Sequence, residues 1–166
     1  MATPTQAIEI PATKDPTLFA RSVAEALFAW DTASGLMPVD HTAMILRVGD
    51  PTGTERAGLA SDIANYLPSR QAWIELRKYA TRQRLSVQRS YVPEAWTVVA
   101  DAAPPGQIQD GTTAITIEGH RRRDGVWGTE AVTSSRAVAF TVFVVCGPTY
   151  EKCHLLRLSQ LDLALR

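Results

Sequence analysis

The segment Asp15–Trp30, DPTLFARSVAEALFAW, carries the clearest structural signal in the chain. Asp15 suits the N-cap of a helix, and Pro16 suits its first turn. Apolar residues then recur at helical spacing, at Leu18, Phe19, Val23, Ala26, Leu27 and Trp30. A helix with such a broad apolar face needs a broad surface to pack against. The sequence therefore predicts a long first helix that lies on a sheet.

Two further helices are expected downstream of this one. Residues 54–67 place several apolar side chains on one side, and Pro68 ends the pattern. Ser69 is expected to cap a third helix, which contains Trp73 and fades near Gln83. Residues 36–50 show no clear period and are expected to form a loop.

The hydrophobic period then changes from helical spacing to simple alternation. Residues 85–92 alternate as in a strand, and Trp96–Ala100 are expected to continue the alternation beyond Pro93, as one bent strand or two. Residues 113–117 predict the next strand, and Asp124-Gly125 is a strong hairpin-turn signal. Residues 127–146 are too long for one ordinary strand, which predicts strong curvature or a break around Ser134-Ser135.

The C-terminal region predicts a last hairpin around Gly147-Pro148. Residues 138–146 and 153–165 are rich in Val, Leu and Phe and flank this turn. The apolar phase slips within the second run, which predicts a β-bulge near Ser159-Gln160. Together the elements indicate an α+β fold, with three N-terminal helices packed on a strongly curved antiparallel sheet. This is the order of elements found in the cone-shaped nuclear transport factor-like fold.

The only two cysteines of the protein, Cys146 and Cys153, lie on either side of this turn. Opposed positions in a hairpin lie close enough for a disulfide after a modest twist, and such a bond needs an oxidising compartment. The other interpretation is two buried thiols acting as small hydrophobes. A zinc site is not expected, because His154 is the only other candidate ligand nearby and it adjoins Cys153.

Length and composition limit the remaining possibilities. The chain has 166 residues, with 17 basic and 17 acidic side chains and a net charge of zero. We expect a single domain over residues 15–166, preceded by an extended linker over residues 1–14. The balanced charge gives no reason to expect a polyanionic partner. The opening residues show no secretion signal, whereas their Thr and Pro content suits a linker that follows a membrane anchor.

Four segments carry a family resemblance: FARSVAEALFAWDTASG, DPTGTERAGLASDIANYLP, WIELRKYATRQRLSVQ and HLLRLSQLDLAL. They resemble conjugal transfer proteins of Gram-positive bacteria, especially actinobacteria, which are similar to the cone-shaped scaffold subunit of type IV secretion systems. The resemblance extends from Asp15 over most of the chain. It lies in the order of elements and the style of sequence, and no catalytic signature contributes to it.

The resemblance implies a non-enzymatic scaffold on the outer face of the cytoplasmic membrane or in the cell wall. In that family an N-terminal membrane helix usually precedes the domain, and this sequence lacks one. The implied partners are other secretion-channel subunits or further copies of the chain, with the membrane reached through an anchor outside this sequence. No cofactor or metal is implied.

The main alternative is a small-molecule-binding or enzymatic cone, of the isomerase or dehydratase kind. Such a site needs a carboxylate or His with a shifted pKa and a donor for a developing oxyanion. Asp31, Tyr66 and Tyr91 are the candidates for a pocket of this kind, although no motif joins them. A third interpretation, close to the scaffold, is an accessory protein of an actinobacterial lipid importer with a similar outer domain.

Two features indicate a candidate contact surface. Arg121, Arg122 and Arg123 form the densest charge cluster and are expected near a hairpin tip, where solvated charges also discourage edge pairing. Nucleic acid is an unlikely partner, because no aromatic-rich binding signature accompanies the cluster. Trp127, between Val126 and Gly128, is expected to be partly exposed and to serve as an interface anchor.

Overall fold

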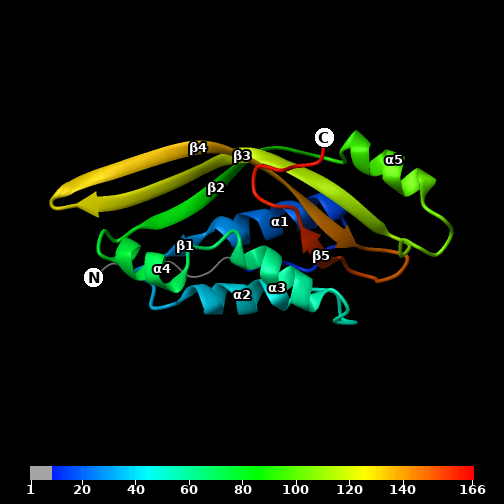
Figure 1. The fold of residues 1–166 in the computed structure, drawn as a ribbon, viewed down its shortest axis with the longest axis horizontal. Helices are drawn as coiled ribbons and strands as arrows, with labels where there is room; N and C mark the ends of the chain where they lie inside the picture. The colour runs from blue at the N-terminus through cyan, green and yellow to red at the C-terminus, as the bar shows by residue number, and fades with distance from the viewer. Residues whose placement is uncertain (1–8) are drawn as a thin grey trace.

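The computed structural model describes residues 9–166, which contain five helices and five strands (Figure 1). The order along the chain is α1 (Pro16–Phe28), β1 (Trp30–Asp31), α2 (Pro38–Leu46), α3 (Arg56–Ala64), α4 (Arg70–Arg77), β2 (Arg82–Tyr91), α5 (Glu94–Ala102), β3 (Thr112–Trp127), β4 (Glu130–Val145) and β5 (His154–Leu158). The fold is α+β, as the sequence predicts. Its strands form one strongly curled antiparallel sheet in the order β1-β2-β3-β4-β5.

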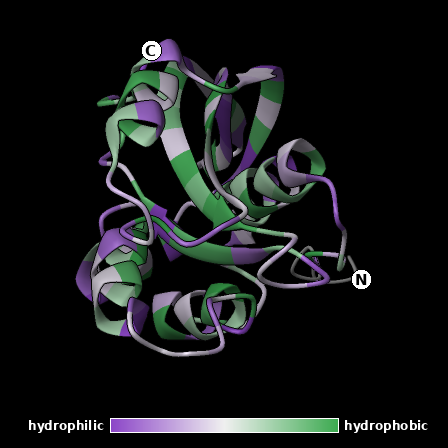
Figure 2. Cartoon of the chain, turned by 90° about the vertical axis from the view of Figure 1, so that its right-hand side faces the viewer, coloured by the Kyte–Doolittle hydropathy of each residue, from purple (hydrophilic) through white to green (hydrophobic). Residues whose placement is uncertain are grey.

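The concave face of the sheet holds α1, and α2 and α3 lie beyond α1 (Figure 1). The buried core joins apolar residues of α1 to inward-facing residues of β3 and β4, among them Phe19, Leu27, Ile117, Phe140 and Val142. Figure 2 shows apolar colouring along the curled strands in the middle of the molecule. The expected packing of a long first helix against a curved sheet is therefore confirmed.

Helix α1 begins where the sequence predicts. The carboxylate Oδ1 of Asp15 accepts hydrogen bonds from the backbone N–H groups of Thr17 and Leu18, at 2.9 and 3.2 Å. The predicted third helix corresponds to α4, where Ser69 Oγ accepts from the N–H of Ala72 at 3.1 Å. These contacts satisfy backbone donors that the first turn of a helix leaves without partners.

The expected loop over residues 36–50 is wrong, because this segment contains α2. Pro38 occupies the first turn of α2, and Asp40 Oδ2 accepts from the backbone N–H of Met37 at 2.7 Å. Of its nine residues only His41 and Ile45 are buried. Their spacing of four is a helical repeat that a mostly exposed helix makes hard to recognise.

The expected strand at Trp96–Ala100 is also wrong, because these residues lie in α5. None of the residues of α5 is fully buried, and Val98 and Val99 are exposed. The ring of Trp96 packs edge-on against Phe143, with ring centroids 5.9 Å apart, on the outer face of the sheet. Because α5 has no fully buried residue, its apolar residues do not show the periodicity of a buried helix face.

The predicted hairpin turn at Asp124-Gly125 lies too early in the chain. Strand β3 continues to Trp127, and the turn follows at Gly128, which has φ +64°. Strand β4 then runs from Glu130 to Val145, so the alternative of a break around Ser134-Ser135 is wrong. Asp124 lies within the ladder, where its Oδ1 accepts from Thr133 Oγ1 at 2.9 Å.

The last strand is shorter than predicted, and the bulge lies elsewhere. Strand β5 ends at Leu158, and its irregularity lies earlier, because Phe143 pairs with Arg157 and Val144 with Leu155, which leaves Leu156 as the extra residue. Beyond Leu158 the chain follows the edge of β4 irregularly, with Asp162 N–H donating to Ala139 O at 2.8 Å. The slip in apolar phase therefore marks the end of the strand.

Residues 1–8 of the expected N-terminal linker lie outside the described residues. In the remainder, Ile10 packs against the core, and the carbonyl of Thr13 accepts from the N–H of Cys153 at 2.9 Å. The segment just before α1 is thus held against the last hairpin.

Candidate functional site

Strands β3 and β4 form a long hairpin that extends past the helices at one end of the molecule (Figure 1). We call residues 121–136 of this hairpin the arm. Strand β2 pairs with β3 only as far as Asp124, and beyond it the N–H of Val126 donates to the carbonyl of Tyr79 at 2.7 Å. The segment between α4 and β2 is therefore hydrogen-bonded to the arm through Tyr79.

The end of the arm exposes a group of large apolar side chains. Trp127 is 67% exposed and stacks on Tyr79, with ring centroids 5.2 Å apart and planes 30° from parallel. Val126 and Val132 are 44% and 42% exposed. We call Tyr79, Trp127 and Val132 the tip patch, because Val132 and Trp127 share one face of the hairpin while Val126 is on the other face. The exposure of Trp127 agrees with the sequence-based expectation, whereas Tyr79 and Val132 carried no signal that would have placed them beside it.

The outer edge of β4 is a second feature of the arm. Within residues 9–166, no strand pairs with this edge between Glu130 and Ala137. Further along, Ala139 and Thr141 use this edge to bond with the chain that follows β5. The N–H and C=O groups of every second residue of a strand point to the same edge. The backbone groups of Thr133 and Ser135 therefore point to the open edge, in step with those of Ala139 and Thr141. An unpaired edge of this length is a template for an additional strand.

The three arginines lie within the arm and not at its turn. Arg121, Arg122 and Arg123 pair with Arg136, Ser135 and Ser134 of β4. The side chain of Arg122 is on the outer face, where it forms an ion pair with Asp124 at 3.1 Å. Arg121 and Arg123 are on the inner face and line a pocket next to the end of α1. The cluster is therefore divided between the two faces of the sheet.

Two of the predicted pocket residues face different parts of the molecule. Tyr66 is buried on the concave side, where its hydroxyl donates to the carbonyl of Ser159 at 2.6 Å. Burial raises the pKa of Tyr66 above its ordinary range. Asp31 lies on β1, and its Oδ1 accepts from the N–H of Ala33 at 2.9 Å in a local turn.

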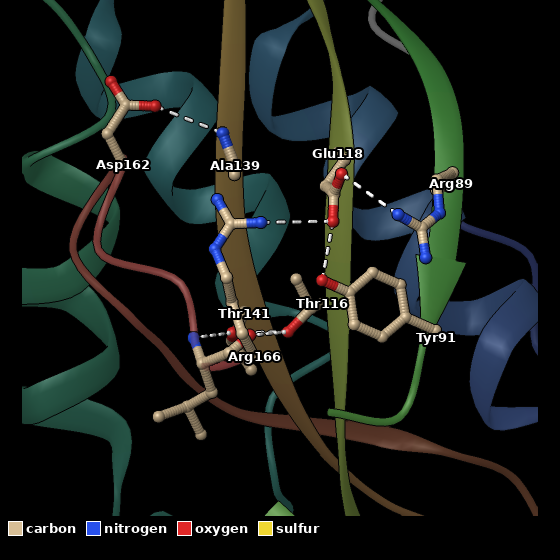
Figure 3. Close-up of polar contacts among 9 residues, drawn as sticks. Arg89, Tyr91, Thr116, Glu118, Ala139, Thr141, Asp162 and Arg166 are labelled. Carbon is tan, nitrogen blue, oxygen red and sulfur yellow. Dashed lines mark hydrogen bonds and ion pairs between the residues drawn. The ribbon is translucent and has the colours of Figure 1, made fainter. Parts of the chain in front are cut away.

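Tyr91, the third predicted pocket residue, belongs to a network on the outer face of the sheet (Figure 3). Its hydroxyl donates to Glu118 Oε2 at 2.6 Å, which together with burial raises the pKa of Tyr91. The same carboxylate contacts Arg89 at 3.6 Å and Arg166 at 3.4 Å. The structure therefore does not bring Tyr91 together with Tyr66 and Asp31 around one cavity.

The same network fixes the end of the described chain across the outer face (Figure 3). Thr141 Oγ1 accepts from the N–H of Leu165 at 2.9 Å, and Thr116 Oγ1 donates to the carbonyl of Leu165 at 2.6 Å. Thr116 and Thr141 are both fully buried by this crossing. The outer face of the central sheet is consequently covered, which leaves the arm as the main open part of β3 and β4.

Cys146 and Cys153 are joined by a disulfide, the first of the two interpretations open from the sequence. Both are 3% exposed, within the core. A buried disulfide is typical of proteins that fold in an oxidising compartment, and the pair is thus consistent with an extracytoplasmic location. Among residues 9–166, none of the helices has the length and apolar character needed to cross a bilayer.

Comparison of the chain with protein-family models, with curated proteins and with solved structures found no match in any of the three.

Proposed function

We propose that this chain is a non-enzymatic, extracytoplasmic scaffold domain of a conjugative type IV secretion apparatus, with a nuclear transport factor-like cone as its fold. It acts through protein–protein contacts made by the arm. The membrane is reached through an anchor outside this sequence, and the partners are other subunits of the channel. The resemblance of the four sequence segments supports the apparatus, and the disulfide supports the location.

The observation that carries the proposal is the arm itself. It combines exposed aromatic and branched side chains with an unpaired strand edge beside them. Aromatic residues, Trp and Tyr above all, are enriched among the side chains that dominate binding energy at interfaces. A strand from a partner can pair with the β4 edge while the tip patch packs against that partner's side chains. The occupant we propose is therefore an extended segment of a neighbouring channel subunit.

An enzymatic cone is the less favoured function because its expected residues are not assembled. Tyr91 is on the outer face, Tyr66 is buried on the concave side, and Asp31 is engaged in a turn. General acid–base chemistry needs such groups within hydrogen-bonding reach of one substrate.

Two substitutions in the arm test the proposal in cells that carry the conjugative element. Trp127→Ala removes the largest exposed side chain, and Ser135→Pro removes an outward N–H without a change in the β3–β4 ladder. We expect each to lower conjugation frequency at least about tenfold, since hot-spot residues contribute 2 kcal/mol or more. Val98→Ala is the matched control, because Val98 is similarly exposed but lies on α5.

A photo-reactive residue at position 127 identifies the occupant directly. Cross-linking to a channel subunit, at a site in an extended segment, supports the proposal. Normal conjugation by both arm variants contradicts it, and so does a cross-link formed only between two copies of this chain, which would assign the arm to self-association.

A further inference from the structure

An open pocket of about 390 Å³ lies on the concave side, between the C-terminal end of α1 and the base of the arm. Its wall comes from several elements that are far apart in sequence. The apolar part consists of Phe28, Leu67, Pro68, Ala72, Leu76 and Leu161. The polar part consists of Asn65, Tyr66, Gln83, Arg121 and Arg123. This combination of an apolar wall and a few convergent polar groups is typical of small-molecule sites.

Arg121 and Arg123 enter the pocket because they are two residues apart on one strand. Side chains at that spacing in β3 share a face of the sheet, whereas Arg122 between them points to the opposite face. The two guanidinium groups therefore lie side by side on the same wall. Each presents several N–H donors, in the planar arrangement that matches a carboxylate.

No carboxylate of the described residues forms an ion pair with either arginine. Arg123 donates from Nε to Gln83 Oε1 at 2.8 Å and lies over the ring of Trp30, 5.2 Å from its centroid. The Nε of Arg121, by contrast, is buried and has no hydrogen-bond partner within the described part of the chain. A buried donor without a partner is costly, so the free protein holds Arg121 in an unfavourable environment.

Further positive charge surrounds this pair. Arg136 lies opposite Arg121 on β4 and forms an ion pair with Asp162 at 3.6 Å. Burial, then Arg121 and Arg136, lowers the pKa of Arg123 to about 10. Burial and Arg136 likewise lower the pKa of Arg121, an effect that Asp162 opposes. Both groups stay charged at neutral pH, and a bound anion would relieve their mutual repulsion.

We infer that this pocket binds a small organic anion, whose carboxylate accepts hydrogen bonds from Arg121 and Arg123 and whose apolar body packs against Phe28, Leu76 and Leu161. The pocket volume of about 390 Å³ lies within the range of small-molecule sites, and the pocket is open to solvent on one side. This inference does not depend on the proposed scaffold function. The tip patch and the open edge of β4 share no residue with the pocket, which is lined by Arg121 and Arg123 at the base of the arm, so the two sets of tests fail separately.

Octanoate is a suitable probe, with octan-1-ol as its uncharged counterpart, and isothermal titration calorimetry on the full chain measures both. We expect octanoate to bind at least about tenfold more tightly than octan-1-ol, because hydrogen bonds to charged groups are worth a factor of ten or more. Arg121→Gln should weaken octanoate binding at least about tenfold. Arg122→Gln removes the same charge one residue away, on the other face, and should leave binding within about twofold.

Two further measurements keep the result interpretable. Arg121→Lys retains the charge but loses the planar donor arrangement, so its affinity should lie between those of the wild-type protein and Arg121→Gln. Thermal unfolding of ligand-free Arg121→Gln should show little loss of stability, because the substitution removes a buried Nε that has no hydrogen-bond partner among residues 9–166. A loss of binding with the fold intact then belongs to the pocket.

Several outcomes would overturn the inference. Equal affinity for octanoate and octan-1-ol, or no binding of octanoate, removes the anion site. An equal effect of Arg122→Gln and Arg121→Gln shows that only overall charge matters. Inorganic phosphate that binds as well as octanoate removes the role of the apolar wall. A short peptide with a free C-terminal carboxylate that binds more tightly than octanoate assigns the pocket to a protein chain end.

Discussion

Asp62 and Arg157 join α3 to β5 through a set of charged hydrogen bonds. Nε and Nη2 of Arg157 donate to the two oxygens of Asp62 at 2.7 and 3.1 Å. The N–H of Leu158 donates to Asp62 as well, at 3.0 Å. Glu55 takes the remaining side of the guanidinium at 3.2 Å but is more exposed than Asp62. The two carboxylates therefore contribute unequally to the same contact.

Asp62→Ala should destabilise the protein by about 1.5–3 kcal/mol, because it breaks a bidentate pair and leaves a backbone donor without its partner. Glu55→Ala should cost less than about 1 kcal/mol, as expected for an exposed ion pair. Urea unfolding followed by circular dichroism gives both values. Equal losses for the two variants would show that the orientation and burial of Asp62 are unimportant.

At this scale the sequence predicts local contacts better than distant ones. The cap at Asp15 depends on residues two and three positions away, and it was predicted. The pocket depends on Arg121 and Tyr66 meeting the segment after β5, which no local pattern contains. The division of the arginine cluster between two faces follows from strand alternation. The expected turn at Asp124-Gly125 puts all three arginines near a solvated hairpin tip, and this expectation hides their division between the two faces.

Among the elements, the sequence predicts α1 from its buried face and α4 from its cap at Ser69, although α4 buries only Trp73. Helix α1 presents a continuous buried face, and its periodicity is plain in the sequence. Helices α2 and α5 bury few or no side chains, so their apolar residues follow no single face. The turn signal at Asp124 was overridden by pairing, because its side chain finds partners within the β3–β4 ladder. Tertiary pairing therefore decides the length of both strands.

The curl of the sheet has a local cause at Gly119. The register between β2 and β3 shifts between Val87 and Arg89, opposite this glycine. A Cβ atom at position 119 would collide with the backbone carbonyl of Ser86. The strands can thus approach and bend here only in the absence of a side chain.

Gly119→Ala should therefore destabilise the protein by about 1–3 kcal/mol, as expected for an added carbon in a packed site. Gly125→Ala, further along β3, should cost less, because its nearest contact would be the Tyr79 carbonyl at 3.1 Å. Chemical denaturation of both variants measures the difference. A larger cost at position 125 would mean that the bend does not depend on close approach at Gly119.

For the whole molecule, the disulfide restricts the unfolded chain across seven positions of sequence. Replacement of both cysteines by serine should lower the free energy of unfolding by about 2.5 kcal/mol, from the entropy of an unfolded chain without that loop. For a domain of this size the midpoint of thermal unfolding should fall by about 5–10 °C. Calorimetry on the oxidised protein and the double variant provides the test, and identical midpoints would contradict it.

The general architecture followed from the sequence, while the position of the open surfaces did not. An apolar first helix and a series of alternating segments already imply a sheet wrapped around that helix. The tip patch needs the extra residues of β3 and the support of Tyr79, and both come from long-range pairing. The anchor role of Trp127 and the arginine contacts remain predictions, now tied to a defined arm and a defined pocket.

The bond between Thr13 and Cys153 has a mechanical consequence. A pull on the chain ahead of α1 meets this contact once Ile10 has left the core, and the load passes into a turn closed by a covalent link. From there it spreads into β4 and β5 while α1 stays seated in the sheet. Tension applied on that side would therefore load the disulfide-linked hairpin before it separates α1 from the sheet.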